Sequence, residues 1–446
     1  MNIFEKEGII SMKLFIVNFK GGDKMKIKKI KIGGFRNIKE TTIELEDITS
    51  LLSVNSYGKS NFLNGIIFGM DFIHAPNDIK NAIMNYTPHR PFNKNIIGEN
   101  FKFELELSAQ IDKVDYDVQY GYVFAWQKNE DKKGRIINEY LKVKENETQK
   151  YTSFITRENE NGYYKSSRTG SCDKKIKISY NELIINKLLA FDSIYCHSLL
   201  KDINNISVYV DRHFSTNESY NMQTNKNFSA YGLIEEINVP KSLCKIKVDF
   251  PDKYELIVNT MKDIFPYIKD INCYEYNPNL GKNVNENESY ALSDNFYVLI
   301  TKDKNLSMPI NFSNMSDGVK RALLIFTILV LADINSYSLV GIEEPENSLN
   351  PKVLQRYLMA LKAFSKKSKV IITSHSPYLV NYINPKDIYI GLPNDSGLAI
   401  FSRIKEKSVN KLVNDANNYD MLVGDYLFDL MSGDEEDLET IAKYTE

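Results

Sequence analysis

Two adjacent glutamates, Glu343 and Glu344, follow a short apolar segment at residues 337–342. The segment is too short for a typical helix and is bounded by turn-forming residues, so it predicts a buried strand of a parallel sheet. Carboxylates at the carboxyl end of such a strand lie where open α/β sheets bind their ligands. One of them could hold a hydrated Mg²⁺, and the next could orient or deprotonate an attacking water. The alternative is that the pair simply begins a solvated loop.

A second candidate site is a loop that joins a predicted strand, residues 48–52, to a predicted helix that begins near residue 62. The loop nearly matches the phosphate-binding pattern G-x-x-x-x-G-K-[ST]. Gly58 lets the backbone approach a phosphate, Lys59 can neutralise its charge, and Ser60 offers a hydroxyl to Mg²⁺. The N-terminus of the helix adds a dipole that favours an anion. This stretch therefore predicts a phosphate site.

A third candidate lies where a polar turn, residues 311–315, enters an apolar helix predicted over residues 322–331. Ser316 or Asp317 is the expected N-cap, and a well-capped helix is the simplest interpretation. A Ser-x-Gly sequence ending at Gly318 would also make this helix N-terminus an anion site. Two phosphate sites on one chain are most simply explained if two subunits face each other and each closes over the nucleotide of the other.

A lone histidine, His375, follows the next predicted buried strand, residues 369–373. A helix predicted over residues 353–364 separates this strand from the acidic pair. The position puts His375 at the same sheet edge as Lys59 and Glu344. It therefore favours contact with a γ-phosphate or a water over a role in the core.

The remaining patterns describe the elements around these sites. Alternating apolar residues at 101–107 and 116–124 predict an antiparallel sheet, and helical periodicity occurs at 181–202 and 231–268. Basic clusters at 132–135 and 174–177 are either solvated faces, which is the commoner case, or DNA contacts.

Composition describes an ordinary globular chain of 446 residues, with 43% hydrophobic and 26% charged residues. A net charge of −2 gives no global basic field, so any binding of nucleic acid needs a local patch. The four cysteines and five histidines are scattered, which argues against a disulfide framework and a zinc site and fits a reducing cytoplasm. The sequence contains no run of about 18 apolar residues, so it predicts no membrane span.

Residues 1–24 contain only a weak apolar segment. Residues 20–23 can be encoded by a sequence that matches a bacterial ribosome-binding site, and Met25 follows after one lysine. We therefore expect Met25 to be the true start and residues 1–24 to be a translated, non-native leader or a disordered extension.

Together these motifs resemble, in order and spacing, the nucleotide-binding domains of the ABC superfamily, and most closely the branch of SMC proteins, RecF and bacterial OLD-like AAA family ATPases. Residues 35–38 resemble the N-terminal F-R-N motif of the branch, and residues 55–60 its Walker A motif. Residues 316–321 resemble the signature motif and residues 342–346 Walker B. Residues 348–351 resemble the D-loop, and His375 the switch histidine.

The resemblance implies specific roles for these residues. Glu344 would be catalytic, with His375 sensing the γ-phosphate, while Ser60 and Glu343 would hold Mg²⁺. ATP would be bound by Arg36, Asn55, Ser56, Tyr57, Gly58, Lys59, Ser60 and Asn61, and by Ser316 and Gly318 of a second subunit.

Three departures from the family pattern are visible. Ser53 and Ser56 stand at glycine positions of Walker A, and Asn350 stands where the D-loop often has histidine. Serine fits at position 53 only if the backbone there does not need a positive φ. The Q-loop glutamine stays open between Gln110, Gln119 and Gln127.

The implied fold is α/β: an ABC-type P-loop ATPase head, a mixed sheet with flanking helices, split by a long, partly helical insertion. The head would comprise residues 25–130 and 301–446, and residues 131–300 would form a mostly helical insertion or lid with basic patches. The implied molecule is a cytoplasmic ATP hydrolase without a membrane segment. Two heads would sandwich ATP between them and so form a homodimer. A higher oligomer is left open.

The process driven by ATP is a separate question. Because the insertion has no long heptad arms of the SMC type, we favour anti-phage defence with a separate nuclease or toxin, and DNA binding through the basic patches of the insertion. The alternatives are a non-catalytic ATP-dependent scaffold and a DNA-repair ATPase of the RecF type. A transporter subunit is disfavoured by the F-R-N motif and the inserted middle.

Overall fold

The computed structural model describes residues 25–53, 57–111, 114–128, 133–145, 150–211, 220, 237–276, 295–365, 368–392 and 396–445. The leader expected over residues 1–24 lies outside the described residues, as do Asn55 and Ser56 of the Walker A sequence.

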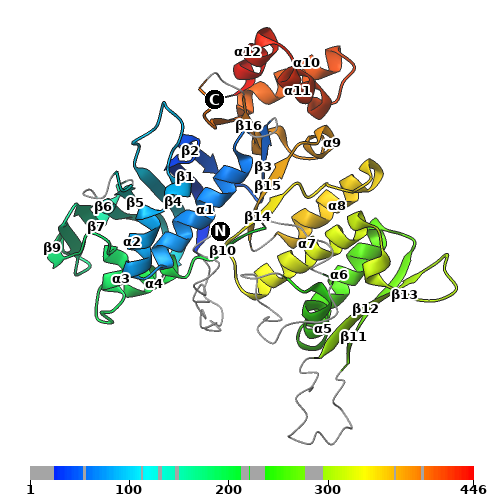
Figure 1. Ribbon diagram of the computed structural model, residues 1–446, viewed down its shortest axis with the longest axis horizontal. Coiled ribbons are helices and arrows are strands. Elements are labelled where there is room, and N and C mark those ends of the chain that lie inside the picture. Colours follow the sequence, from blue (N-terminus) through cyan, green and yellow to red (C-terminus); the bar gives the residue numbers. More distant parts are fainter. Residues whose placement is uncertain are drawn as a thin grey trace, which may run out of the picture.

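A six-stranded sheet forms the centre of the molecule (Figure 1). Its order is β10 (Val208–Val210), β14 (Leu339–Glu343), β15 (Lys369–Ser374), β3 (Ile48–Ser53), β16 (Ile388–Gly391) and β17 (Phe401–Arg403). The first five strands are parallel and β17 is antiparallel. The carboxyl ends of β3, β14 and β15 therefore lie at one edge, as the sequence predicts for Lys59, Glu344 and His375.

An eight-stranded antiparallel sheet lies to one side. Its order is β2 (Ile38–Glu44), β1 (Lys26–Phe35), β4 (Phe101–Ile111), β5 (Val114–Ala125), β6 (Arg135–Glu145), β7 (Thr152–Glu158), β8 (Asn161–Lys165) and β9 (Cys172–Lys177). The antiparallel sheet predicted from residues 101–124 is confirmed by β4 and β5.

The expectation of a mostly helical region over residues 131–300 is wrong for its first part, because β6 to β9 extend the same sheet to residue 177. Two features hide these strands in the sequence. A carboxylate, Glu139, occupies a buried, inward-facing position of β6. A register shift between β6 and β7 also leaves Phe154 without a partner on β6, so two consecutive residues of β7, Phe154 and Ile155, are buried and the alternation is interrupted there. The helical periodicity at 181–202 is confirmed in two short pieces, α3 (Ile184–Leu188) and α4 (His197–Asn204), and residues 189–196 between them are not helical. The periodicity at 231–268 is confirmed by α5 (Val239–Asp249) and α6 (Pro251–Ile264), while residues 231–236 lie outside the described residues.

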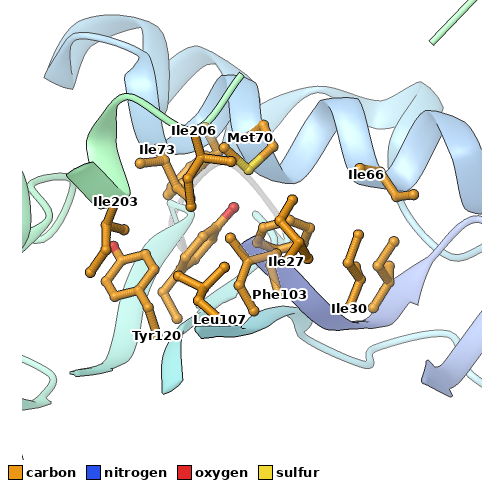
Figure 2. Packing of buried hydrophobic residues seen from close by; sticks show 14 of the residues in the cluster. Ile27, Ile30, Ile66, Met70, Ile73, Phe103, Leu107, Tyr120, Ile203 and Ile206 are labelled. Carbon is orange, nitrogen blue, oxygen red and sulfur yellow. The ribbon is translucent and has the colours of Figure 1, made fainter. Parts of the chain in front are cut away.

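Helix α1 (Lys59–His74) packs across the eight-stranded sheet and also contacts β3 and β10 of the central sheet. Figure 2 shows Ile66, Met70 and Ile73 of α1 over Ile27 and Phe103 of the sheet. The helix lies so close that a Cβ on Gly69 would be 2.2 Å from the Phe103 ring. Helix α2 (Asn77–Asn85) and the 3-10 turn Thr87–His89 follow.

A second core joins α5 and α6 to α7 (Asp317–Ile334), α8 (Pro351–Phe364) and a small sheet. The small sheet has the order β11 (Ile268–Tyr276), β12 (Phe296–Asp303) and β13 (Ile310–Asn311), and the 3-10 turn Phe312–Asn314 follows it. The helices predicted over 322–331 and 353–364 are confirmed by α7 and α8.

A third core near the C-terminus covers β3 and β16 through Leu52, Ile388 and Ile390. It is built from α9 (Pro377–Val380), α10 (Val409–Asn418), α11 (Val423–Ser432) and α12 (Glu435–Tyr444), with 3-10 turns at Pro385–Asp387 and Glu406–Ser408. In Figure 1 the last three helices form a red group at the end of the central sheet. The predicted α/β class with a mixed sheet and flanking helices is thus confirmed. Among the described residues, no helix has both the length and the apolar character needed to cross a membrane.

Candidate functional site

The phosphate-binding loop of the sequence runs from the end of β3 to the start of α1. Gly58 stands at the helix N-cap with φ of +119°, a conformation that favours glycine. A Cβ at this position would lie 3.0 Å from side-chain atoms of Asn37 and 2.7 Å from the Cβ of Ala399. Gly58 is therefore required both by its backbone angle and by the close approach of two other segments.

Ser53, which replaces the first glycine of the pattern, is the last residue of β3 and pairs with Gly391. It is not among the residues with positive φ, so serine fits the backbone at this position. Its carbonyl and hydroxyl oxygens both accept hydrogen bonds from Lys59 Nζ, at 2.9 and 3.1 Å. The departure from the glycine pattern thus supplies a further oxygen that holds the lysine.

Lys59 is 6% exposed, and burial lowers the pKa of its ammonium group to about 8. The carboxylates of Glu344, Glu343 and Glu346 act in the opposite direction. Because Lys59 is the first residue of α1, the positive end of the helix dipole also opposes its charge. An anion bound at this helix end would relieve both costs.

His375 lies between Lys59 and Glu344. Its Nδ1 is 3.3 Å from Lys59 Nζ, and its Nε2 is 3.4 Å from Oε1 of Glu344. Burial and the neighbouring Lys59 lower the pKa of the imidazole, while Glu344 and a backbone hydrogen bond at Ser53 act against them. The imidazole is therefore neutral near pH 7. We call these side chains the Lys59–His375–Glu344 row. His375 and Glu344 directly follow β15 and β14, and Lys59 begins α1, the helix that comes after β3; these three strands are adjacent.

Glu344 follows β14 in a left-handed backbone conformation, with φ of +44°. Its N–H donates to Thr373 O at 2.9 Å, and its Oε2 accepts from Asn347 Nδ2 at 2.5 Å. Arg321 on α7 donates from Nη2 to the carbonyl oxygens of Glu343 and Glu344, at 2.7 and 2.8 Å. The turn that carries both carboxylates is thus fastened to the neighbouring strand and to the helix of the signature sequence.

Glu346 is a further member of this region that the sequence reasoning did not place among the site residues. Its Oε1 accepts a hydrogen bond of 2.5 Å from Ser374 Oγ, which in turn accepts from Ser376 N at 2.9 Å. Burial raises the pKa of the Glu346 carboxyl. In the sequence, these hydrogen bonds beside His375 are indicated only by the position of Glu346 in the acidic stretch and by the serines on either side of the histidine.

The F-R-N turn lies beside the same loop. Arg36, with φ of +50°, donates from Nη1 to Asn61 Oδ1 at 2.8 Å. Asn61 Nδ2 donates to Asn37 Oδ1 at 2.8 Å, and Asn37 Nδ2 donates to Tyr57 O at 3.2 Å. The structure thus brings Arg36, Tyr57 and Asn61 together beside Gly58, and their contact with a nucleotide stays a prediction.

Ser316 and Gly318 lie at the N-terminus of α7. Ser316 occupies the N-cap position and is exposed, but its side chain makes no capping hydrogen bond. Gly318 packs under the D-loop, since a Cβ there would be 2.2 Å from Ser348 O. Across the described part of the chain, neither residue is hydrogen-bonded to the Lys59–His375–Glu344 row.

Ser60 is exposed in the first turn of α1, and Glu343 is half-buried at the end of β14. Within the described ranges, no group of three or more histidine, cysteine, aspartate or glutamate side chains is arranged to hold a metal ion. A Mg²⁺ ion at this edge would therefore take one hydroxyl, one carboxylate, phosphate oxygens and waters, which is the usual set for Mg²⁺ with a nucleotide.

Two of the candidate Q-loop glutamines have partners elsewhere. Gln119 donates to Glu106 Oε1 at 3.2 Å on the neighbouring strand, and Gln127 accepts from Arg90 at 3.5 Å. The side chain of Gln110 lies outside the described residues. The choice of Q-loop residue therefore stays open.

Comparison with known proteins gives one family. Residues 25–380 match the profile of the AAA ATPase domain. None of the curated proteins matches the chain significantly.

Similar solved structures include three heads of SMC proteins. The SMC head domain from Thermotoga maritima has 12% identity and a TM-score of 0.41, with coverage of 85% of this chain and 99% of that chain. An Smc head bound to the C-winged helix domain of ScpA has 12% identity and a TM-score of 0.46, with coverage of 86% and 99%. An Smc head with an extended coiled coil, bound to the C-terminal domain of ScpA from Pyrococcus furiosus, has 11% identity and a TM-score of 0.46, with coverage of 88% and 100%. Because the family match spans most of the sequence and contains the whole row, the chain belongs to the AAA ATPase domain family.

Proposed function

We propose that this protein binds ATP with Mg²⁺ and hydrolyses ATP at the Lys59–His375–Glu344 row. The observation that carries the proposal is the convergence of these three side chains, 3.3 and 3.4 Å apart, from the ends of three adjacent strands. A lysine, a neutral imidazole and a carboxylate in contact are the groups needed to hold a phosphate and to orient a water.

The residues present fit a nucleotide. Gly58 leaves the backbone open beside the N-terminus of α1, and Lys59 is a buried cation whose charge is disfavoured without an anion. Ser60 and Glu343 would hold Mg²⁺, which when bound neutralises charge on the phosphates. Arg36 and Asn61 would contact the nucleotide from the F-R-N turn, and Asn55 and Ser56 complete the loop in the sequence.

Within the row each residue has a separate task. Glu344 would orient or deprotonate the attacking water, since its carboxylate faces the imidazole. His375 would sense the γ-phosphate, and because it contacts both Lys59 and Glu344, a change in its position would affect both residues. Positioning and charge stabilisation carry nearly all of such catalysis, so small displacements of these three groups should be costly.

The active form is proposed to be a homodimer in which Ser316 and Gly318 of one subunit contact the nucleotide held by the other. The support is exposed Ser316 at the N-terminus of an 18-residue helix, where its side chain makes no capping hydrogen bond to that helix. Arg321 on the same helix holds the Glu343–Glu344 turn, so a contact at the helix N-terminus is physically connected to the catalytic carboxylate.

The process driven by ATP is proposed to be related to DNA in the cytoplasm, and we favour anti-phage defence with a separate nuclease or toxin. Exposed lysines on the edge strand β9, namely Lys174, Lys175 and Lys177, support a DNA contact. A repair ATPase of the RecF type is the alternative within the same class. A non-catalytic scaffold is the second candidate, because Asn347 and His375 already engage the carboxylate of Glu344.

The decisive experiment is ATP turnover by the purified protein, with and without double-stranded DNA, and with Glu344→Gln as the blank. Turnover that DNA stimulates supports the DNA-related ATPase, and turnover indifferent to DNA directs attention to a protein partner. Binding of ATP without turnover above the blank supports the scaffold. Sedimentation of Glu344→Gln with and without ATP tests the dimer, since a species of unchanged mass would contradict it.

A further inference from the structure

We propose that a short segment beyond the matched family domain, residues 399–401, positions the phosphate-binding loop and thereby sets the affinity for nucleotide. We call it the anchor segment. It leads into β17, at the edge of the central sheet, and the family match ends at residue 380. The inference rests on the proposed binding of ATP, and it assigns a positioning role rather than a catalytic one.

The first contact is with Tyr57, the residue that precedes Gly58. The ring of Tyr57 packs edge-on against Phe401, with ring centroids 6.0 Å apart, and its hydroxyl accepts a hydrogen bond of 3.3 Å from Ile400 N. The ring also fills the space over Gly391, where a Cβ would lie 2.6 Å from it. Tyr57 is only 9% exposed, so a side chain of the loop is buried against the C-terminal part of the chain.

The second contact is with Gly58 itself. The methyl group of Ala399 lies 2.7 Å from the position that a Cβ of Gly58 would take. Ala399 is held in place from both sides, because its N–H donates to Asn37 O at 2.9 Å and its carbonyl accepts from Thr41 Oγ1 at 3.3 Å. The anchor segment therefore forms a fixed wall beside the glycine that must approach the phosphate.

The third contact is with the start of α1. Phe401 packs near Phe62, with ring centroids 6.4 Å apart, and both residues belong to the large hydrophobic core. Beyond the segment, Arg403 of β17 donates to Glu44 and Glu46 at 2.7 and 3.1 Å. The segment is thus anchored independently of the loop, as a positioning element must be.

These contacts matter because Gly58 must hold one backbone geometry, with a positive φ, to approach a phosphate. Residues that become ordered only when a ligand binds lose conformational entropy at that moment, and this loss weakens binding. Burial of Tyr57 and the wall at Ala399 hold Tyr57 and Gly58 in one geometry before nucleotide arrives. The expected consequence is an effect on KM and on the dissociation constant for ATP, with little effect on kcat.

The test uses the full chain with Tyr57→Phe and Ala399→Val. Tyr57→Phe keeps the ring and removes the hydroxyl that accepts from Ile400, and Ala399→Val adds bulk toward Gly58. Tyr254→Phe is the matched control, because its buried hydroxyl donates to Ile271 O at 2.8 Å in the separate core of α5 to α8. ATP binding is measured by equilibrium dialysis with ATP and Mg²⁺, turnover by phosphate release, and local stability by amide hydrogen exchange of residues 57–62 without nucleotide.

Tyr57→Phe should weaken ATP binding by about three- to tenfold, the equivalent of one lost hydrogen bond, and Ala399→Val by about tenfold or more. In Ala399→Val kcat should stay within about twofold, and in both variants amide exchange at residues 57–62 should become faster, while Tyr254→Phe should change none of these. Unchanged affinity and unchanged exchange in both variants would overturn the inference. If the wild-type protein bound no ATP, the proposed function would fail, and the exchange measurement would still decide whether the anchor segment holds the loop.

Discussion

Two buried lysines lie at opposite ends of helix α1, and burial lowers the pKa of each ammonium group to about 8. Lys59 is the first residue of the helix. Lys80 comes from α2, is fully buried, and donates from Nζ to the carbonyl oxygens of Ile73 and Ala75 at the end of α1. By burial and by pKa alone the two residues could not be told apart.

Their surroundings differ in a way that separates structure from function. The cation of Lys80 lies at the negative end of the helix dipole and caps carbonyl groups that have no partner within the helix. The carboxylates that act on it, Glu139 and Glu182, belong to the fold, and Glu139 itself accepts from two backbone N–H groups at the start of α3. The charge of Lys80 is therefore balanced by carbonyl groups and carboxylates that belong to the fold itself.

Lys59 lies at the positive end of the same dipole, and its nitrogen is held by a serine and by a neutral imidazole. The nearest carboxylates are those proposed to hold Mg²⁺ and to orient water. A buried lysine thus indicates an anion site when the carboxylates that balance its charge have proposed roles in binding a metal ion or orienting a water.

The largest expected effect is that of Lys59→Met. Loss of the cation should lower kcat/KM for ATP by at least about 100-fold, since the phosphates lose their main positive partner. The free energy of unfolding should change by no more than about 1 kcal/mol, because the cost of burying the ammonium group is removed together with its two hydrogen bonds to Ser53. Steady-state kinetics and urea unfolding measure the two quantities.

Lys80→Met is the matched control for this variant. It should leave kcat/KM per folded molecule unchanged, because its nitrogen donates at the carboxyl end of α1, the opposite end of the helix from Lys59. The comparison would break if both substitutions reduced turnover to the same extent.

The next largest effect is expected from substitution of the carboxylates near the two lysines. Glu344→Gln should lower kcat by about 10²- to 10³-fold while ATP still binds, since an amide cannot act as a base for water. Glu139→Gln, its counterpart near Lys80, should instead lower the free energy of unfolding by about 1–3 kcal/mol with kcat unchanged. Rapid-quench turnover, ATP binding and chemical unfolding of both variants provide the test, and a Glu344→Gln protein with normal turnover would remove Glu344 from the mechanism.

Sequence patterns were sufficient to predict the end of β3, the acidic end of β14 and His375, because each follows a short buried strand of a parallel sheet. In such a sheet the carboxyl ends of neighbouring strands meet at one edge, so the order of motifs already predicts their proximity. The roles of these residues remain predictions.

Other features depend on contacts that no local pattern contains. The hydrogen bond between Ile400 and Tyr57 joins residues 343 positions apart. Lys80 occupies a short helix with few apolar residues, yet its side chain is buried and donates to Ile73 and Ala75 at the end of α1. The strands β6 to β9 were missed because Glu139 replaces an apolar residue at a buried position, where backbone N–H groups satisfy it.

A smaller effect concerns the pH dependence of stability through Lys80. Its pKa is 10.5 when exposed and about 8 in the folded chain, so between these values the unfolded chain binds more protons and stability rises with pH. The contribution of one such group is at most about 1.4 kcal/mol per pH unit. Unfolding free energies at pH 7.5, 8.5 and 9.5 should therefore rise less steeply in Lys80→Met than in the wild type. Lys177→Met, at an exposed position of β9, should keep the wild-type slope, and a Lys80→Met slope equal to it would contradict the assignment.

The smallest expected effect is that of Glu346→Gln, which asks whether the third carboxyl near Lys59 acts through its charge or its shape. Burial raises the pKa of Glu346, so its protonated form, which glutamine resembles, is favoured. The glutamine oxygen can still accept from Ser374, and kcat should stay within about threefold of the wild type. Glu346→Ala leaves the hydroxyl of Ser374 without its acceptor beside His375 and should lower kcat by about tenfold. If Glu346→Gln were instead as impaired as Glu344→Gln, the charge of Glu346 would take part in the reaction. Lys59 would then lie near three carboxylates with a role in catalysis, instead of the two proposed above, whereas Lys80 lies near none.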